Sequence, residues 1–245
     1  MYTAMKFLFI LVFFTAVTTN FCAAQLMDVI PGNTGVYSGI HTNDLVLLSQ
    51  SEVVNTNNTD VSGSPFWNEE WKAAVVYTDN YMIFIPKVKL NLYTNDVWYT
   101  TPSGVVMTAK KEKVKGITFF TGPDTTRVLA NFAYLKNGDD NTYRYYEFMN
   151  AGKAHLVKLN TVTLNKGLFD PFTGKSEMNY VTQTAYYLYY NATITLLKGD
   201  NRETIFSVLQ PGSAAKEWLD KSKNKLKSNA DILLFLNYFN TQRPG

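Results

Sequence analysis

Residues 64–108 read SPFWNEEWKAAVVYTDNYMIFIPKVKLNLYTNDVWYTTPSGVVMT, and this stretch decides the predicted fold. Short runs rich in Val, Tyr, Ile and Thr alternate with brief polar breaks, which is typical of β-hairpins. The runs expected to form strands are Ala73 to Thr78, Tyr81 to Ile85, Val88 to Thr94, Val97 to Thr101 and Val105 to Thr108. Connections this short cannot hold a crossover helix, so we expect neighbouring strands to pair antiparallel.

The same pattern continues as far as Leu197. The further runs expected to form strands are Ile117 to Phe120, Arg127 to Leu135, Tyr143 to Met149, Ala154 to Leu164, Tyr180 to Tyr190 and Thr193 to Leu197. Residues 166–179 contain Asp170-Pro171 and Thr173-Gly174 and indicate a long polar connection. We therefore predict one antiparallel β-meander of about ten strands, built as an open sheet, a sandwich or a half-barrel.

Apolar residues change their spacing after Lys198, from every second position to every third and fourth. This change predicts two or three helices within residues 201–240. The residues expected to cap them are Asp200 with Glu203, Ser213, and Ser228 with Asp231. The stripe expected to be buried on the last helix is Ile232, Phe235, Leu236 and Phe239. Strands first and helices last predict an α+β class that is mostly β, and we expect Trp98 and Tyr99 to receive the stripe.

The N-terminal 24 residues have the order of a secretory signal peptide. Lys6 gives a positive start, Phe7 to Val17 is apolar, and Cys22-Ala23-Ala24 supplies small residues for cleavage. A retained membrane anchor and a lipidated Cys22 are the alternatives, and Phe21 disfavours the second. After cleavage we expect a polar arm or linker over residues 25–63, one domain over residues 64–240 and a tail over residues 241–245. The expected location is secreted, periplasmic or at the cell envelope.

Composition excludes several classes of protein. Cys22 is the single cysteine, so the cleaved chain has no disulfide, no thiolate nucleophile and no cysteine metal ligand. The net charge of +3 is too small and too diffuse for a nucleic-acid surface. No apolar run after Ala24 is long enough to cross a bilayer. A cell-envelope partner or an apolar ligand is the partner class left open.

Candidate catalytic groups are few. His41 and His155 are the two histidines, and neither has a second histidine at metal-ligand spacing. The carboxylates considered are Glu69, Glu70, Asp139, Asp140 and Glu147. Adjacent carboxylates on a strand point to opposite faces, so neither adjacent pair suits a glycosidase. The acidic loop at residues 137–141 lacks the order of an EF-hand. We therefore assign no catalytic, metal or cofactor site and expect a non-enzymatic protein without a cofactor.

Aromatic residues are the most unusual feature. They are the tryptophans Trp67, Trp71, Trp98 and Trp218 and the tyrosine clusters Tyr143, Tyr145, Tyr146 and Tyr186, Tyr187, Tyr189, Tyr190. Exposed rings would form a platform for a sugar or another flat ligand. Rings packed across strands are the other interpretation, and we favour it. At Tyr186 to Tyr190, where both faces of the strand are aromatic, we expect helices to cover one side.

Four segments carry a resemblance to uncharacterised secreted proteins of bacteroidete bacteria. They are Gly63 to Trp67, Leu90 to Val97, Tyr186 to Tyr189, and the ending Leu233 to Asn240 after a lysine-rich helix. The resemblance covers residues 63–240 and implies a signal peptide, a β-meander and terminal helices, with no activity to carry over. The chain departs from it at Asn191-Ala192-Thr193, which is also a glycosylation sequon and stands where a glycine-containing turn is expected.

Taken together, these features predict a non-enzymatic secreted or envelope protein with a binding or structural role. Two alternatives stay open. One is a carrier that encloses a lipid or another apolar ligand between the sheet and the helices. The other is a carbohydrate-binding module or hydrolase.

Overall fold

The computed structural model describes residues 36–38, 48–53, 61–79, 81–122, 125–131, 143–170, 172, 175–198 and 201–242. The expected signal peptide, His41, Asp139, Asp140, the cap Asp200 and residues 243–245 of the expected tail lie outside these residues.

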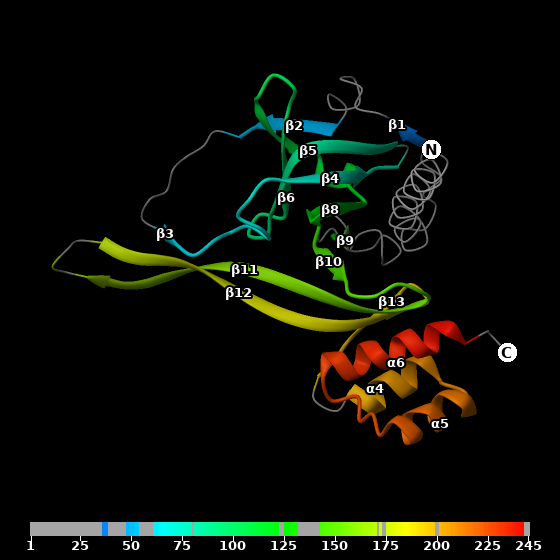
Figure 1. Ribbon diagram of the computed structural model, residues 1–245. Coiled ribbons are helices and arrows are strands. Elements are labelled where there is room, and N and C mark those ends of the chain that lie inside the picture. Colours follow the sequence, from blue (N-terminus) through cyan, green and yellow to red (C-terminus); the bar gives the residue numbers. More distant parts are fainter. Residues whose placement is uncertain are drawn as a thin grey trace, which may run out of the picture.

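One twisted, open sheet dominates the molecule (Figure 1). Its strands follow the order β13-β12-β11-β10-β9-β8-β4-β5-β6-β7-β2, and each neighbouring pair along this path is antiparallel. The strands are β2 (Ser49–Glu52), β4 (Lys72–Tyr77), β5 (Tyr81–Asn91), β6 (Asp96–Thr100), β7 (Val106–Ala109), β8 (Gly116–Gly122), β9 (Thr125–Asn131), β10 (Tyr145–Phe148), β11 (Ala154–Asp170), β12 (Lys175–Tyr190) and β13 (Thr193–Leu196). The predicted class, α+β and mostly β, is confirmed. Two meanders, β4–β7 and β8–β13, are joined through the pairing of β4 with β8.

Three short strands lie in the segment that the sequence assigns to a polar arm. They are β1 (Val36–Ser38), β2 and β3 (Val61–Ser62). β1 pairs parallel with β5, β2 pairs with β7, and β3 pairs parallel with β12. The arm assignment for residues 25–63 therefore needs correction where the segment is described, because backbone hydrogen bonds hold these strands to the sheet.

The sequence predicted that a strand ends before Pro86, and this prediction is wrong. β5 runs from Tyr81 to Asn91 as one strand, and its pairing with β4 is irregular between Ile85 and Val88. Proline lacks a backbone N–H, so it is tolerated where the ladder of hydrogen bonds is already interrupted.

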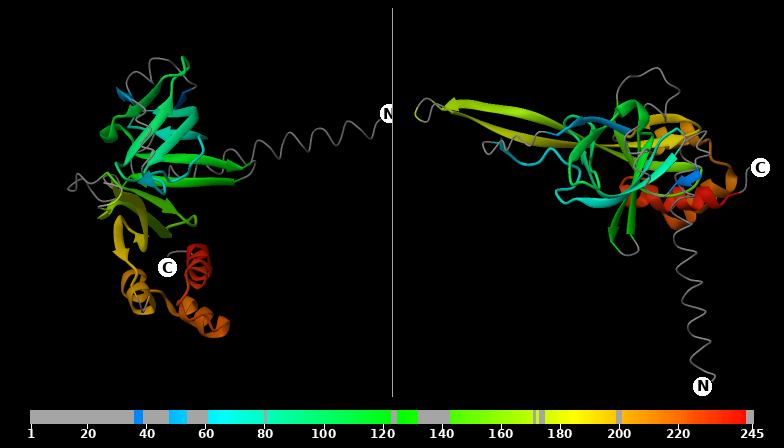
Figure 2. Two further views of the ribbon diagram at one scale, coloured as in Figure 1. Left: turned by 90° about the vertical axis from the view of Figure 1, so that its left-hand side faces the viewer. Right: turned by 90° about the horizontal axis from the view of Figure 1, so that it is seen from above.

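The prediction of a polar connection at residues 166–179 is also wrong. β11 continues to Asp170 and β12 begins at Lys175, with Asn165 opposite Asn179. This outer part of the hairpin extends past the body of the molecule (Figures 1 and 2). Lys166 and Gly167 on β11 and Glu177 and Asn179 on β12 are exposed there. Solvated strands have no reason to alternate apolar and polar residues, which explains the missing signal.

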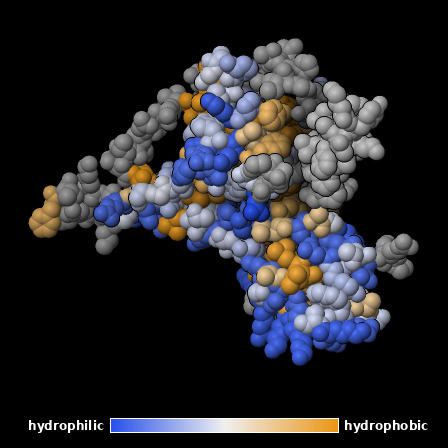
Figure 3. Space-filling model, in the orientation of Figure 1, coloured by the Kyte–Doolittle hydropathy of each residue, from blue (hydrophilic) through white to orange (hydrophobic). Residues whose placement is uncertain are grey.

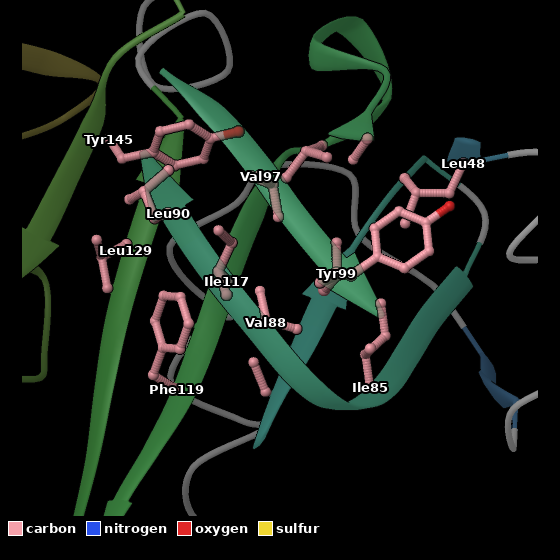
Figure 4. Close-up of a cluster of buried hydrophobic side chains, with 14 of the residues drawn as sticks. Leu48, Ile85, Val88, Leu90, Val97, Tyr99, Ile117, Phe119, Leu129 and Tyr145 are labelled. Atoms are coloured by element: carbon pink, nitrogen blue, oxygen red, sulfur yellow. The ribbon is translucent and has the colours of Figure 1, made fainter. Parts of the chain in front are cut away.

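The main core fills the concave side of the sheet. Figure 4 shows Leu90 of β5 near Leu129 of β9, and Tyr99 of β6 near Leu48 and Ile85. Ile117 and Phe119 of β8 belong to the same cluster. Tyr99 and Ile117 are fully buried. Strands far apart along the chain thus share one core, because the sheet curls on itself.

Three helices cover one end of the β11–β12 hairpin, the end at which β11 begins and β12 finishes (Figure 1). They are α4 (Asn201–Leu209), α5 (Ser213–Ser222) and α6 (Asn229–Thr241). The predicted stripe is confirmed, since Ile232, Phe235 and Leu236 are fully buried. Ser228 and Asp231 form the predicted capping box. The N-cap of α5 is Gly212, so the prediction of Ser213 is wrong by one residue.

The amphipathic character of the helices is visible on the surface. On the face shown in Figure 3, the outer side of the helical end is mainly hydrophilic. Lys216 and Lys221 of α5 are exposed there, whereas Ala215 and Leu219 of the same helix are buried. No helix in the described part of the chain is long and apolar enough to cross a membrane.

The expected docking of the stripe on Trp98 and Tyr99 is wrong. Phe239 instead lies 6.1 Å from the ring of Tyr190 on β12, and α6 contacts β11. The physical reason is connectivity: the helices follow β13, which pairs with β12, whereas β6 lies seven strands further along the sheet from β12. Tyr99 is buried in the main core, and Trp98 lies on the opposite face of β6.

Candidate functional site

His155 is a packed histidine of β11. It is 4% exposed, and its Nδ1 lies 2.9 Å from the carbonyl oxygen of Asn150. Its ring lies edge-on to Phe148, with centroids 4.9 Å apart. Burial also raises the pKa of the neighbouring Tyr189 phenol, so this hydroxyl stays neutral. These contacts give His155 a structural role beside the β10–β11 turn.

The adjacent carboxylates Glu69 and Glu70 are exposed, in the irregular segment before β4. Lys72 forms an ion pair with Glu70, and this hydrogen bond and the lysine charge lower the pKa of the Glu70 carboxyl. Glu69 and Glu70 are therefore solvated charges outside the strands.

Glu147 of β10 is the centre of a buried charge cluster. Its side chain is 6% exposed, and one carboxylate oxygen lies 2.8 Å from Nζ of Lys158, its cross-strand neighbour on β11. Arg127 Nε lies 3.8 Å from the other oxygen, and the indole N–H of Trp67 donates at 3.4 Å. The Glu147 carboxylate is thus engaged in structural contacts with two cationic side chains and one indole N–H. The pairing follows from strand register, which the linear sequence does not reveal.

Metal-ligating groups do not gather in the described ranges. No set of three or more His, Cys, Asp or Glu side chains there is close enough to hold a metal ion.

An aromatic hollow lies on the outer face of β5 and β6. Its volume is about 160 Å³, and we define it by the residues that line it, Val53, Phe66, Trp71, Lys89, Trp98 and Val106. Strand alternation builds it. Val88 and Leu90 point into the core, so Lys89 between them points outward. Register places Trp98 of β6 opposite Lys89.

The segment before β4 supplies the other rings. Phe66 bridges to Asn91 and the Trp67 N–H donates to the Leu90 carbonyl at 2.9 Å, so this segment runs antiparallel beside β5. Trp67 then faces inward and stacks on Phe119, with centroids 4.8 Å apart. Phe66 faces outward and meets the edge of Trp98 at 5.1 Å. One dipeptide therefore contributes to both the core and the hollow.

Lys89 places a positive charge among these rings. Its Nζ lies 4.7 Å from the centroid of Phe66 and 5.3 Å from the centroid of Trp71. Both distances are within the range of cation–π attraction, which contributes about 0.5–1 kcal/mol at exposed sites. No carboxylate in the described part of the chain pairs with this ammonium group.

Trp98 carries a second donor without an acceptor. Its indole Nε1 is buried, and none of the described residues accepts a hydrogen bond from it. An unmade hydrogen bond of this kind costs about 1–3 kcal/mol. Lys89 and Trp98 thus both line the aromatic hollow, and neither donor has an acceptor among the described residues.

A second hollow, of about 380 Å³, lies beside the first on the same strands. It is mainly apolar, and its lining includes Phe84, Pro86, Thr100 and Pro102. Phe84 lies 6.1 Å from the ring of Phe120, which is 38% exposed. This hollow is open to the surface and is separate from the helix–sheet interface.

Sequence reasoning marked Trp71 and Trp98 as unusual but did not join them into a site. It assigned Trp98 to packing, and it singled out neither Phe66 nor Lys89 for a functional role. The available signal is local: Lys89 interrupts the apolar residues Val88 and Leu90, which predicts an outward lysine on a strand. The approach of residues 64–71 to β5 could not be read from the sequence.

Comparison of the chain with protein-family models, curated proteins and solved structures finds no significant match.

Proposed function

We propose that this chain is a non-enzymatic, secreted or cell-envelope protein that binds carbohydrate through the aromatic hollow. The observation that carries the proposal is the gathering of Phe66, Trp71 and Trp98 outside the main core, each half-buried with part of its ring surface accessible. Aromatic faces offer flat apolar area at a small cost in conformational entropy, and they suit the C–H faces of sugar rings.

The size of the hollow limits what it holds. Its volume of about 160 Å³ is below the roughly 300–1,000 Å³ of pockets for drug-sized ligands. A single sugar ring is therefore the unit we expect inside it, with the remainder of an oligosaccharide on the surface of β5 and β6. Recognition of one ring predicts weak binding by a single site, strengthened when several copies act together.

The secreted or envelope location is supported by the order of residues 1–24, which is that of a signal peptide. The non-enzymatic assignment is supported by the environment of the carboxylates. Glu147 is neutralised by Lys158 and Arg127, and Glu70 is exposed beside Lys72. Neither arrangement favours proton transfer to a bound sugar.

The apolar-ligand carrier is a weaker candidate. The interface between sheet and helices contains Leu156, Leu188, Ile205, Leu219 and Phe235, each at most 1% exposed. A lipid bound there would have to displace these packed side chains. The open hollow at Phe84 and Pro86 would shelter only part of a lipid chain.

A glycan array with the full chain tests the proposal. We expect the parent to bind a subset of glycans and Trp71→Ala to lose that binding. Phe172→Ala is the matched control, because Phe172 is 98% exposed in the β11–β12 connection, away from the hollow. Thermal unfolding of each variant establishes that it is folded. Absence of glycan binding by the parent, or full binding by Trp71→Ala, would contradict the proposed function.

A further inference from the structure

We infer that the carbohydrate bound at the aromatic hollow is acidic, carrying a carboxylate or a sulfate on the ring that enters the hollow. This inference rests on the proposed carbohydrate-binding function and names its ligand class. The evidence for it is the presence of two hydrogen-bond donors, on Lys89 and Trp98. The evidence for the proposed function is the grouping of the aromatic rings of Phe66, Trp71 and Trp98.

Lys89 differs from three other lysines in or beside the sheet that are partly or fully buried. Lys111 pairs with Asp96 at 3.0 Å, Lys115 with Asp79 at 2.9 Å, and Lys158 with Glu147 at 2.8 Å. Lys89 has only the faces of Phe66 and Trp71 as partners within the described ranges. Its ammonium group therefore has the capacity for an anionic partner that the described residues do not supply.

Binding of an acidic sugar would give the Lys89 ammonium group an anionic partner in place of the aromatic rings. The ammonium group leaves the faces of Phe66 and Trp71 for the carboxylate or sulfate, and the freed faces receive the ring of the sugar. The flexible four-carbon stem of lysine permits this movement without a change in the backbone. A hydrogen bond between two charged groups is among the stronger ones, which favours the exchange.

Trp98 supplies the second contact. Its Nε1–H is enclosed in the free protein and has no acceptor among the described residues. Once Lys89 moves, we expect a hydroxyl, carboxylate or sulfate oxygen of the ligand to accept this hydrogen bond. A ligand rich in acceptor oxygens therefore removes an unfavourable feature of the free protein, whereas a purely apolar ligand does not.

A cationic ligand is disfavoured at this place. Aromatic rings also bind quaternary ammonium groups, but Lys89 already holds a positive charge within 5.3 Å of two of the rings. A second cation there would meet like-charge repulsion.

Paired glycans test the inference. The array should contain uronic, sialylated and sulfated glycans beside the methyl-esterified, desialylated and desulfated forms of the same chains. We expect the parent to bind the acidic form roughly tenfold or more tightly than its neutral form, with affinity falling as salt rises. Lys89→Met, which keeps the alkyl stem, should lose this preference. Lys89→Arg, which keeps the charge, should retain most of it.

Trp98→Phe gives an independent readout. The substitution keeps a ring but removes a donor that has no acceptor among the described residues. We expect thermal stability to be unchanged or higher and affinity for the acidic glycan to fall. A purely structural role for Trp98 would lower stability and leave the preference for charge intact.

The outcomes separate the two proposals. Equal binding of acidic and neutral glycans, or an unchanged preference in Lys89→Met, overturns the inference and leaves carbohydrate binding standing. Binding of poly-glutamate at the hollow as tightly as any glycan also overturns it, in favour of an acidic peptide. Failure to bind any glycan removes the proposed function and the inference together.

Discussion

Asn240, in the last turn of α6, occupies the space where a side chain on Gly152 would lie. A Cβ placed on Gly152 would stand 2.4 Å from Cγ of Asn240. The Asn240 amide donates to the carbonyls of Ala151 and Ala154, each at 2.8 Å, and its oxygen accepts from the Ala154 N–H at 2.9 Å. These three hydrogen bonds tie the end of the chain's last helix to the β10–β11 turn.

Gly152→Ala should therefore lower the free energy of unfolding by about 2 kcal/mol or more, measured by urea denaturation. Two causes act together: Gly152 has φ +115°, and the new methyl group would displace Asn240. Gly104→Ala separates them. Gly104 has φ +87° with no atom within 4 Å of the added Cβ, so it should show backbone strain alone, roughly 1 kcal/mol.

The Asn240 contact is tested by combining substitutions. In an Asn240→Ala background, Gly152→Ala should cost less than in the parent, because the displaced amide is already gone. Equal costs in both backgrounds would show that the amide group of Asn240 has no part in the effect.

Ala192→Gly should stabilise the protein by about 1 kcal/mol and raise Tm by roughly 2–4 °C. Asn191 and Ala192, which connect β12 and β13, have φ of 48° and 56°. Two positive φ values in a two-residue hairpin connection are typical of a type I′ turn, where glycine is favoured. Scanning calorimetry checks the change. Ala151→Gly, where φ is not positive, should be neutral or destabilising, and a stabilisation there would undermine the explanation.

Glu147→Gln should lower the free energy of unfolding by about 2 kcal/mol. The value is below the roughly 3–5 kcal/mol expected for a fully buried pair, because the Lys158 and Arg127 side chains are 23% and 46% exposed. Glu70→Gln is the matched control on an exposed pair and should change stability by less than about 0.5 kcal/mol. Similar effects of the two substitutions in urea unfolding would mean that Glu147 is more solvated than its surroundings indicate.

Phe235→Asp should prevent folding, because it places a charge at a fully buried position between α6 and the sheet. Leu234→Asp is the control on the next residue of the same helix, since Leu234 is 59% exposed. We expect a cooperative thermal transition for Leu234→Asp and none for Phe235→Asp. A normal transition for Phe235→Asp would contradict the packing of α6 on β11 and β12.

Local patterns predicted the elements of this fold well where they are buried on one side. The runs between Ala73 and Thr108, the capping box at Ser228 and the stripe ending at Phe239 all depend on short-range spacing. Local patterns did not predict the strands that are solvated, as at residues 166–179. They also did not predict β1, β2 and β3, which form because distant strands pair with them. These three strands are short and mostly polar, reading VYS, SQSE and VS, so they carry no apolar alternation that predicts a strand.

The candidate site depends on contacts that spacing does not encode. Lys89 and Trp98 are neighbours through the turn between β5 and β6, and that much was within reach of the predicted hairpin. Phe66 and Trp71 join them because the segment before β4 runs beside β5, which is a tertiary arrangement. That no carboxylate of the described residues pairs with Lys89 becomes visible only when the surrounding strands are in place.

The central claim is that an acidic sugar enters the aromatic hollow, and the indole N–H signals measure this most directly. The chain has four tryptophans, so a ¹H–¹⁵N spectrum should contain up to four such signals, and the one missing in Trp98→Phe identifies Nε1 of Trp98. On titration with the acidic glycan selected by the array, we predict that this signal shifts downfield as the donor gains an acceptor, while the signal of Trp218 stays in place. If the acidic glycan binds and the Trp98 signal does not move, the ligand lies elsewhere and the account of the hollow is wrong.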